Sequence, residues 1–419
     1  MIAILIFAGR STRFWPLSEK SLFPFWGTSL LERQIAKLKG AGLKEILLVG
    51  GAHNVKAAKK LYPKMTVIQQ RDLSLGMRGA LLSALPRCKK ESVLIVSAND
   101  VIDESALREL RTKGATKKEG GLILARKVKH YFPGGYLFVK GKRITGIVEK
   151  PKEGSEPSSL INIVAHVHTD ASVLLKALKD TLHTKDDGYE VALDLLFKKY
   201  TYEAVPYTGP WYPVKYPWHL LDLLSSIVPP VVEPKIHATA SIHPSAVIEG
   251  AVVIEGAVRV LAHATILGPC FIGEGTIVAN NALVRGSSVG RHCVIGYGTE
   301  VARSILAENV ETHMSYVGDS ILGSGVSLGG GTVTGNLRLD EQPISSVIDG
   351  VPLSTHRIKL GAMLGEHCRT GIHTSLSPGI KIGVGSFIRS AELVTVDVPD
   401  HSFVKGGLIR PNTKRNAKN

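Results

Sequence analysis

Short apolar runs alternate with amphipathic stretches through the first 228 residues of the chain. The predicted strands are residues 1–7, 45–49, 65–69 and 93–96, and the predicted helices are residues 30–38, 54–61 and 78–85. Strands that alternate with helices indicate βαβ units and an α/β fold whose parallel sheet is buried on both faces. Ligands of such sheets bind beyond the carboxyl ends of the strands, so we expect the functional residues in the loops that follow them.

From about residue 236 onward the apolar pattern has a period of six. Nine successive branched aliphatic residues are spaced six apart: Ile236, Ile242, Ile248, Ile254, Val260, Ile266, Ile272, Val278 and Val284. This period fits neither an α-helix nor an alternating strand, and it is typical of hexapeptide repeats, in which each six residues form one side of a triangular coil. The pattern predicts a left-handed parallel β-helix. Its phase slips after Gly290, and residues 336–356, which lack the repeat, are expected to form a projecting loop.

The two patterns meet at a proline-rich segment that begins with Pro229 and Pro230. We therefore expect an α/β domain over residues 1–228, a linker over 229–235, a β-helix over 236–406 and a basic tail over 407–419. The tail is expected to be a solvated chain end, with a phosphate-contacting arm as the alternative.

The composition is that of a globular protein with an excess of positive charge. Of the 419 residues, 44% are hydrophobic and 21% are charged, and the formal net charge is +15. This excess favours anionic partners such as nucleotides, sugar phosphates, coenzyme A or nucleic acid. The longest apolar runs fall short of the roughly 18 residues that span a bilayer. The four cysteines form no CxxC pair, which argues against a disulfide framework or a zinc site. These features favour a cytoplasmic location and no membrane partner.

The loop after the first predicted strand has the composition of a phosphate-binding loop. Gly9 and the small residues beside it allow backbone N–H groups to approach a phosphate chain, and Arg13 can neutralise its charge. Lys20 follows seven residues later. By themselves, these residues fit an ordinary strand-to-helix turn equally well.

The order of motifs over about 220 residues resembles that of the sugar-1-phosphate nucleotidylyltransferases, whose signature reads GxGTR…PK. The resemblance implies a Rossmann-like domain in which a sugar-1-phosphate oxygen attacks the α-phosphorus of a nucleoside triphosphate and expels pyrophosphate. It implies catalytic roles for Arg13 and Lys20 and a Mg²⁺ ligand in Asp100. The implied nucleotide-binding residues are Ala8, Gly9, Ser11, Thr12, Gln70 and Gly76, and the implied sugar-binding residues are Gly135, Glu149, Lys150 and Asn162.

The chain departs from this family pattern at four positions. Ser11 replaces the glycine at the third position of the signature, Glu19 replaces the proline before the lysine, and Met77 replaces the threonine after Gly76. The second metal ligand of the family, two residues after Trp211, is Pro213 here. Because proline has no side-chain ligand atom, the metal would depend on one carboxylate and on the phosphates of the nucleotide.

Residues 313–336 resemble the acetyltransferase centre of GlmU-type proteins and of the archaeal bifunctional sugar-phosphate enzymes. The resemblance implies that His313 accepts a proton from the amine of the sugar, and that the amine then attacks the thioester of acetyl-CoA. Tyr316 and Asn336 would position the sugar, and Arg285 and Lys359 would clamp its 1-phosphate. The glycines at 329–331 would admit the pantetheine arm. The lysine of the family that precedes the histidine is replaced by Ala302, with Arg303 beside it.

The combined resemblance implies a bifunctional enzyme of UDP-N-acetylglucosamine synthesis that uses acetyl-CoA and Mg²⁺. Its partners would be a nucleoside triphosphate and a sugar-1-phosphate, without nucleic acid, and the β-helices of the family imply a homotrimer. Two alternatives stay open. The chain could be a monofunctional nucleotidylyltransferase whose β-helix only assembles oligomers, or a non-enzymatic assembly protein of the same architecture.

Overall fold

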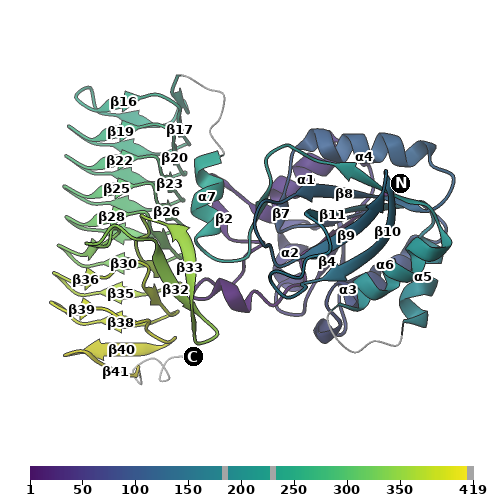
Figure 1. Cartoon of the computed structure of the whole chain (residues 1–419). Coiled ribbons are helices and arrows are strands. Elements are labelled where there is room, and N and C mark those ends of the chain that lie inside the picture. Colours follow the sequence, from purple (N-terminus) through teal and green to yellow (C-terminus); the bar gives the residue numbers. More distant parts are fainter. Residues whose placement is uncertain (182–186, 227–232, 413–419) are drawn as a thin grey trace. The chain divides into compact units, whose positions relative to one another are not determined.

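The structure, a computed structural model, describes residues 1–181, 187–226 and 233–412 (Figure 1). These residues form two compact units. One comprises residues 1–10 and 30–213, and the other comprises residues 11–29 and 214–419. The part of the signature loop after Arg10 therefore groups with the β-helix. Of the expected linker, residues 229–232 lie outside the described residues, as do residues 413–419 of the expected tail.

The first unit is built on a nine-stranded sheet with strand order β5-β4-β1-β6-β11-β8-β12-β10-β9. Its strands are β1 (Ile2–Ile6), β4 (Ile46–Gly50), β5 (Thr66–Gln69), β6 (Val93–Ser97), β8 (Gly121–Lys127), β9 (Gly135–Lys140), β10 (Arg143–Glu149), β11 (Leu160–His168) and β12 (Tyr202–Pro206). A separate antiparallel pair joins β7 (Asp100–Val101) to β13 (Tyr212–Pro213).

The four strands predicted from the sequence are present, and they pair in parallel as expected. The rest of the sheet corrects the expectation of a wholly parallel sheet. Strand β11 runs antiparallel to both β6 and β8, and β9 and β10 form an antiparallel hairpin. The short connection between β9 and β10 explains the hairpin, since only antiparallel neighbours can be joined by a tight turn.

Helices cover both faces of this sheet (Figure 1). They are α1 (Leu30–Gly40), α2 (Val55–Leu61), α3 (Gly76–Ala84), α4 (Glu104–Thr116), α5 (Ala171–Asp180) and α6 (Gly188–Lys199), with short 3₁₀ turns η2 (Leu73–Leu75) and η3 (Leu85–Arg87). Helices α1 and α4 pack together on one face, and α3, α5 and α6 pack on the other. Within the described ranges, no helix is long and apolar enough to cross a membrane.

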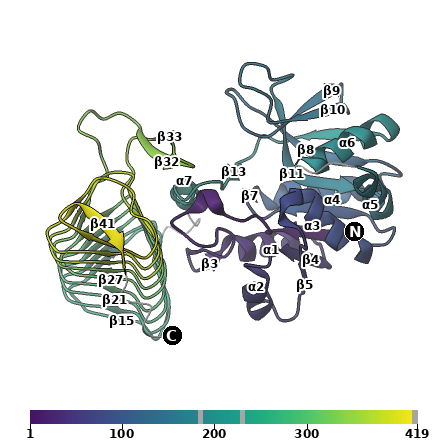
Figure 2. The same cartoon turned by 90° about the horizontal axis from the view of Figure 1, so that it is seen from below.

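The second unit is a parallel β-helix, as predicted, with one sheet along each side of a triangular coil (Figure 2). The first sheet contains β14 (Lys235–Ile236), β17 (Val252–Ile254), β20 (Cys270–Ile272), β23 (Ser288–Val289), β26 (Ile305–Leu306), β29 (Ile321–Leu322), β34 (Met363–Leu364) and β37 (Lys381–Ile382). The second contains β15 (Ser241–Ile242), β18 (Arg259–Val260), β21 (Ile277–Val278), β24 (Val294–Ile295), β27 (Glu311–Thr312), β30 (Ser327–Leu328), β35 (Arg369–Thr370), β38 (Phe387–Ile388), β40 (Ser402–Lys405) and β41 (Leu408–Pro411). The third contains β16 (Val247–Glu249), β19 (Thr265–Leu267), β22 (Leu283–Arg285), β25 (Glu300–Ala302), β28 (Tyr316–Gly318), β31 (Val333–Thr334), β36 (Ser375–Leu376) and β39 (Leu393–Val394).

The register of the coils explains both the repeat and its slip. Ile236 pairs with Ile254 and Ile254 with Ile272, which is three hexapeptides per coil. The next partner of Ile272 is Val289, one position early, so this coil is one residue shorter than those before it. The aliphatic side chains stay stacked in the interior, where Ile254, Ile272 and Val289 are buried. The aliphatic positions therefore shift by one residue along the sequence, while the stack of aliphatic side chains in the core continues without interruption.

A hairpin interrupts the coils where the repeat is absent from the sequence. Leu322 pairs with Leu364, and between them β32 (Ile344–Ile348) and β33 (Val351–Arg357) form an antiparallel pair that projects from a corner (Figure 2). The projecting loop expected over residues 336–356 is thus largely a β-hairpin. At the end of the coils, β41 turns back along β40, so the expected tail begins with a strand.

Residues 11–29 add three short elements to the β-helix unit: η1 (Thr12–Phe14), β2 (Pro24–Phe25) and β3 (Thr28–Ser29). Helix α7 (His219–Ser226) also belongs to this unit, where its Asp222 forms an ion pair with Arg357 of the hairpin.

A fully buried polar cluster lies within the core of the first unit. His166 and His168 are both 0% exposed, on alternate positions of β11. His168 Nδ1 lies 2.7 Å from the hydroxyl of Tyr202, and both imidazoles contact the hydroxyl of Tyr189, at 2.8 and 3.1 Å. Burial lowers the pKa of each histidine to about 3, so both rings stay neutral.

Removing one hydroxyl of this cluster should destabilise the sheet. In Tyr202→Phe, Nδ1 of His168 loses its partner in a site closed to water, which we expect to cost about 1–3 kcal/mol of unfolding free energy. Urea denaturation would measure this loss. Tyr200→Phe, at a half-buried neighbouring position, is the control and should change the midpoint little. Equal effects of the two substitutions would contradict the prediction.

Candidate functional site

Four of the predicted nucleotide-binding residues line one cavity of about 210 Å³ in the first unit. They are Ala8, Gly9, Gln70 and Gly76. Ala8 and Gly9 follow β1 and Gln70 follows β5, so the cavity lies at the carboxyl edge of the parallel strands, where ligands of such sheets bind.

The amide of Gln70 is fixed by the backbone around it. Its Nε2 donates to the carbonyl oxygens of Asp72, at 2.7 Å, and of Gly76, at 2.8 Å. Both amide protons are therefore used within the protein. What the Gln70 side chain can offer to a ligand is its carbonyl oxygen, which accepts hydrogen bonds.

The other residues of the signature lie in the β-helix unit. Ser11 has φ of 54°, in the left-handed region that favours glycine, which accounts for the glycine that the family has at this position. Thr12 and Arg13 form the turn η1 and are exposed, and the guanidinium of Arg13 lies 5.9 Å from the centre of the Tyr216 ring. Lys20 is half-buried.

Three of the predicted sugar-binding residues converge in the first unit. A β-carbon at Gly135 would lie 2.9 Å from Oδ1 of Asn162 and 3.1 Å from Oε2 of Glu149, so these side chains lie close around the glycine and would have to shift to admit a larger residue. Lys150 follows Glu149, and its ammonium lies 3.3 Å from the Glu149 carboxylate. The backbone N–H of Lys150 also donates to Gly134.

A carboxylate that the sequence reasoning missed lies beside this group. Glu190, on α6, is partly buried, and its pKa is raised to about 8, first by burial and then by the negative charge of Glu149. Lys150 opposes this shift. The residue follows no recognised motif, and only the packing of α6 against β10 brings it to Glu149.

The predicted metal ligand Asp100 lies opposite Pro213. The two residues are register partners in the β7–β13 pair, and Oδ1 of Asp100 accepts a hydrogen bond from the Trp211 indole at 2.9 Å. Pro213 therefore occupies the position opposite Asp100, from which a carboxylate side chain could bind the ion that Asp100 is predicted to hold. Within the described part of the chain, no three His, Cys, Asp or Glu side chains gather as a metal site.

A second oxygen donor precedes Asp100 in the chain. Asn99 lines the nucleotide cavity, and its Oδ1 is buried without a hydrogen-bond partner. Carboxylate and amide oxygens are the ligands that Mg²⁺ takes, and it commonly uses one carboxylate together with substrate phosphates. Asp100 and Asn99 thus fit an ion that arrives with a nucleotide. In the sequence, Asn99 and Asp100 together form the motif after a strand that resembles the metal site of the family.

On the β-helix, two of the predicted acetyltransferase residues belong to one hydrogen-bonded cluster. Nδ2 of Asn336 donates to the Tyr316 hydroxyl at 3.2 Å and to Oδ2 of Asp319 at 2.6 Å. Asp319 is buried, and the guanidinium of Arg303 donates hydrogen bonds to both of its carboxylate oxygens, at 2.8 and 2.6 Å. This pairing raises the pKa of Arg303. The guanidinium of Arg303, the residue after Ala302, is therefore held within this cluster by its bonds to Asp319. Sequence reasoning missed Asp319.

His313 lies in the corner between β27 and β28. It is exposed and occupies the corner that precedes Tyr316. The backbone N–H of Gly331 donates to the carbonyl of His313, so the next coil fixes this corner. The ring therefore does not point into the packed interior.

The glycines expected beside the acetyl donor have a structural explanation. A β-carbon at Gly329 would lie 2.5 Å from the backbone of Gly371, and one at Gly331 would lie 2.6 Å from the ring of His373. A side chain at either position would force its neighbours on the next coil to shift, which gives these glycines a structural reason besides contact with the acetyl donor.

The two predicted phosphate clamps differ in their surroundings. Arg285 pairs with Glu300, which lies on the next coil, at 2.6 Å. Lys359 is exposed at the base of the hairpin. Its backbone forms an isolated antiparallel β-bridge with Leu337, the residue after Asn336.

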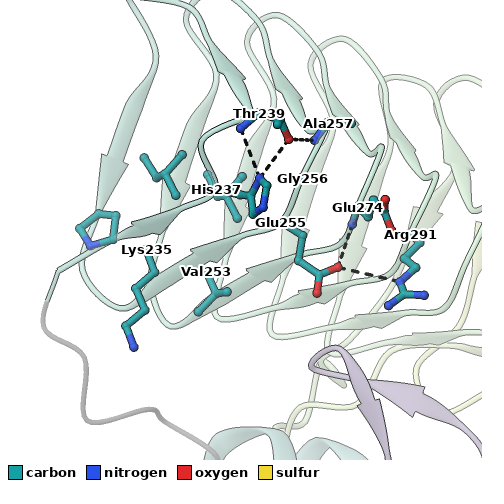
Figure 3. Close-up of a pocket in the computed structure, with 12 residues that line it drawn as sticks. Lys235, His237, Thr239, Val253, Glu255, Gly256, Ala257, Glu274 and Arg291 are labelled. Carbon is teal, nitrogen blue, oxygen red and sulfur yellow. Dashed lines mark hydrogen bonds and ion pairs between the residues drawn. The ribbon is translucent and has the colours of Figure 1, made fainter.

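A further hollow lies on the first coils, away from these clusters (Figure 3). It measures about 840 Å³ and is lined by Pro234, Lys235, Ile236, His237, Thr239, Val253, Ile254, Glu255, Gly256, Ala257, Glu274 and Arg291. Within it, the carboxylate of Glu255 accepts from the backbone of Glu274 at 3.0 Å and lies 3.9 Å from Arg291. None of the predicted substrate residues is among these lining residues.

Comparison with known proteins identifies the family. The family model of the MobA-like NTP transferase domain matches residues 3–227, and that of the GMPPB C-terminal domain matches residues 229–333. The chain is 31% identical to "Bifunctional protein GlmU" of Methanococcus maripaludis strain C7, over 96% of this chain and 97% of the relative. It is 28% identical to the "Bifunctional sugar-1-phosphate nucleotidylyltransferase/acetyltransferase" of Sulfurisphaera tokodaii, over 97% and 100%.

The chain belongs to the bifunctional GlmU family. This confirms the resemblance inferred from the motifs and identifies the nine-stranded sheet as a nucleotidyltransferase domain of Rossmann-like fold. A third relative, the GlmU protein of Methanocaldococcus jannaschii, is 29% identical over 96% of this chain and 97% of its own length. The similarity therefore covers both units rather than one.

The raised pKa of the partly buried Glu190 should make the stability of this GlmU-family chain depend on pH. The native pKa of Glu190 is about 8, whereas that of an unfolded glutamate is about 4.3. Between these values the native state holds a proton that the unfolded state has lost, so stability falls as pH rises through this window. Glu190→Gln should remove this dependence, and its melting temperature relative to the wild type should increase from pH 5 to pH 8.

The control for this experiment is Asp194→Asn on the same helix, which removes an ion pair with Lys198. The melting temperature of this variant relative to the wild type should stay constant over the same range. A constant difference for Glu190→Gln as well would contradict the raised pKa.

Proposed function

We propose that the chain acetylates glucosamine-1-phosphate with acetyl-CoA and transfers a uridylyl group from UTP to the 1-phosphate of a sugar, two steps of UDP-N-acetylglucosamine synthesis. The observation that carries the proposal is its similarity over nearly its full length to relatives named as bifunctional enzymes. The gathering of Ala8, Gly9, Gln70 and Gly76 around one cavity supports the nucleotidyl half. The cluster of Tyr316 and Asn336 supports the acetyl half.

In nucleotidyl transfer, an oxygen of the sugar 1-phosphate attacks the α-phosphorus, a new P–O bond forms, and the bond to the β-phosphate oxygen breaks to release pyrophosphate. Such a reaction needs positive charge around the phosphates more than a base. Arg13 binds the triphosphate and Lys20 bridges the reacting phosphates. Gly135, Glu149, Lys150 and Asn162 hold the sugar. Asp100 and Asn99 would hold a Mg²⁺ ion, which would supply positive charge beside the phosphates.

The fixed amide of Gln70 supports selection among the bases. Its carbonyl oxygen pairs with a ring N–H, which uracil, thymine and guanine carry and which adenine and cytosine lack on the corresponding edge. Among the triphosphates whose bases carry this N–H, UTP is the one that the proposed product requires.

In acetyl transfer, the amine nitrogen attacks the thioester carbonyl, a C–N bond forms, the C–S bond breaks, and the thiol of coenzyme A leaves. His313 accepts the proton that the amine must lose. Tyr316 and Asn336 position the acceptor, and Arg285 and Lys359 hold its phosphate.

We propose that the chain acts as a homotrimer whose copies meet through the third sheet of the β-helix. The outward ladder of this sheet carries exposed apolar side chains at Val247, Val333 and Leu393, each at least 42% exposed. These side chains are separated on the ladder by Thr265, Glu300 and Ser375 among others, so the proposal rests mainly on the homotrimer that the family resemblance implies.

The acetyl half is tested by following thiol release from acetyl-CoA with glucosamine-1-phosphate. His313→Ala should lower kcat by about 10²- to 10⁴-fold, and added imidazole should restore part of it, because the reaction loses a proton acceptor. The control is His263→Asn at another exposed corner, where φ is 60° and asparagine is tolerated. A His313→Ala chain as active as the wild type would refute the mechanism.

The nucleotidyl half is tested by measuring pyrophosphate release from each nucleoside triphosphate with N-acetylglucosamine-1-phosphate and Mg²⁺. We expect UTP to be used best. Pro213→Asp should lower the Mg²⁺ concentration for half-maximal rate several-fold, because it adds a carboxylate opposite Asp100. Pro213→Ala controls for the loss of the proline ring and should not lower it. Absence of turnover with every triphosphate would refute this half.

A further inference from the structure

The loop that carries Arg13 and Lys20 is held by side chains near the end of the β-helix. Nε1 of Trp15 donates to Oδ1 of Asp400 at 2.9 Å, and Oγ of Ser18 donates to Oε1 of Glu366 at 2.7 Å. Both bonds join residues that are more than 340 positions apart in the chain. Trp15 lies two residues after Arg13, and Ser18 lies two residues before Lys20.

A buried lysine completes this attachment. The side chain of Lys381 is only 3% exposed, and its ammonium lies 3.1 Å from Asp397, donates to the carbonyl of Val347, and lies 5.1 Å from the centre of the Trp15 ring. An ammonium has three donor hydrogens and a charge that aromatic faces attract. The ion pair, the carbonyl and the ring together compensate its removal from water.

The same loop is attached at a second point along the coils. The backbone N–H of Trp26 donates to Oγ of Ser288 at 2.7 Å, and its ring lies 6.1 Å from that of Phe271. Gly27 lies so close to Phe271 that a β-carbon there would meet the ring at 2.7 Å. The segment between Trp15 and Trp26, which includes Lys20, is therefore fixed at both ends to the β-helix.

We propose that Trp15, Ser18, Lys381, Asp400 and Glu366 are positioning residues for nucleotidyl transfer, which set the conformation of the loop that presents Arg13 and Lys20. The inference rests on the proposed function of that loop. The β-helix then serves both reactions. It carries the acetyl site, and it holds in shape the phosphate-binding loop of the other site. Because a misplacement of about 1 Å can cost roughly 100-fold in rate, these bonds should affect kcat.

The first test substitutes residues of the loop, because the side chains of Lys381 and Asp400 also bind other parts of the β-helix unit. Trp15→Phe with Ser18→Ala removes both donors and keeps an aromatic ring over Lys381. We expect kcat for pyrophosphate release to fall between about tenfold and 100-fold, while thiol release in the acetyl reaction stays at the wild-type rate. Amide hydrogen exchange should become faster over residues 11–29 and stay unchanged in the coils.

Two further variants separate positioning from a general loss of structure. Asp400→Asn keeps an accepting oxygen for Trp15 and should retain most of the wild-type kcat. Lys381→Met removes the charge beneath Trp15 and should lower kcat for pyrophosphate release, whereas Lys405→Met, at an exposed lysine of β40, should not.

The outcomes distinguish this inference from the function on which it rests. Full pyrophosphate release by the Trp15→Phe, Ser18→Ala chain would refute the positioning role and leave the proposed function standing. Equal losses in both reactions would also refute it, because they would indicate a general structural defect. A wild-type chain that releases no pyrophosphate from any triphosphate would overturn the proposed function and this inference with it.

Discussion

Every coil of the β-helix must pair its backbone with the coils on either side, and this stacking decides which side chains the unit can accept. Inward positions take mostly aliphatic residues, and many corners take glycine or residues that adopt a positive φ, such as Gly331, Asn281 and His373. What remains for chemistry is the outward ladder and the exposed corners. His313 occupies one such corner, and the Tyr316 cluster begins on the outward ladder of the following strand.

The corner after β28 shows how a buried charge is tolerated under this constraint. Asp319 is 1% exposed, yet both of its oxygens bind Arg303 and one also accepts from Asn336. A carboxylate removed from water without such partners would be strongly destabilising. Because Arg303 stands one coil before Asp319, stacking itself brings the pair together. The same contacts then fix the amide of Asn336 and the hydroxyl of Tyr316.

What could be predicted from the sequence was whatever has a local period or a fixed motif order. The period of six predicted the β-helix, and the alternation of apolar runs with amphipathic stretches predicted the four parallel strands β1, β4, β5 and β6. Antiparallel β11, the carboxyl pair of Glu190 with Glu149, and the bond of Trp15 to Asp400 depend on contacts between distant segments. No local pattern encodes such contacts. Asp319 was missed for a related reason, since its partner is set by coil length.

The attachment of the signature loop also gives physical meaning to its departures from the family pattern. Ser11 adopts the backbone conformation that glycine would favour, so the turn keeps its shape at some cost in strain. Glu19, in place of a proline, accepts a hydrogen bond from the backbone of Ser21 at 3.0 Å and so restrains the backbone around Lys20 with its side chain. Both replacements change how the loop is stabilised and leave its charged residues in place. Pro213 is different in kind, because it removes a ligand atom opposite Asp100 and nothing in its own side chain can replace it. The departure that bears on the proposed chemistry is therefore at the predicted metal site, where the phosphates of the nucleotide would supply the oxygens that the protein lacks.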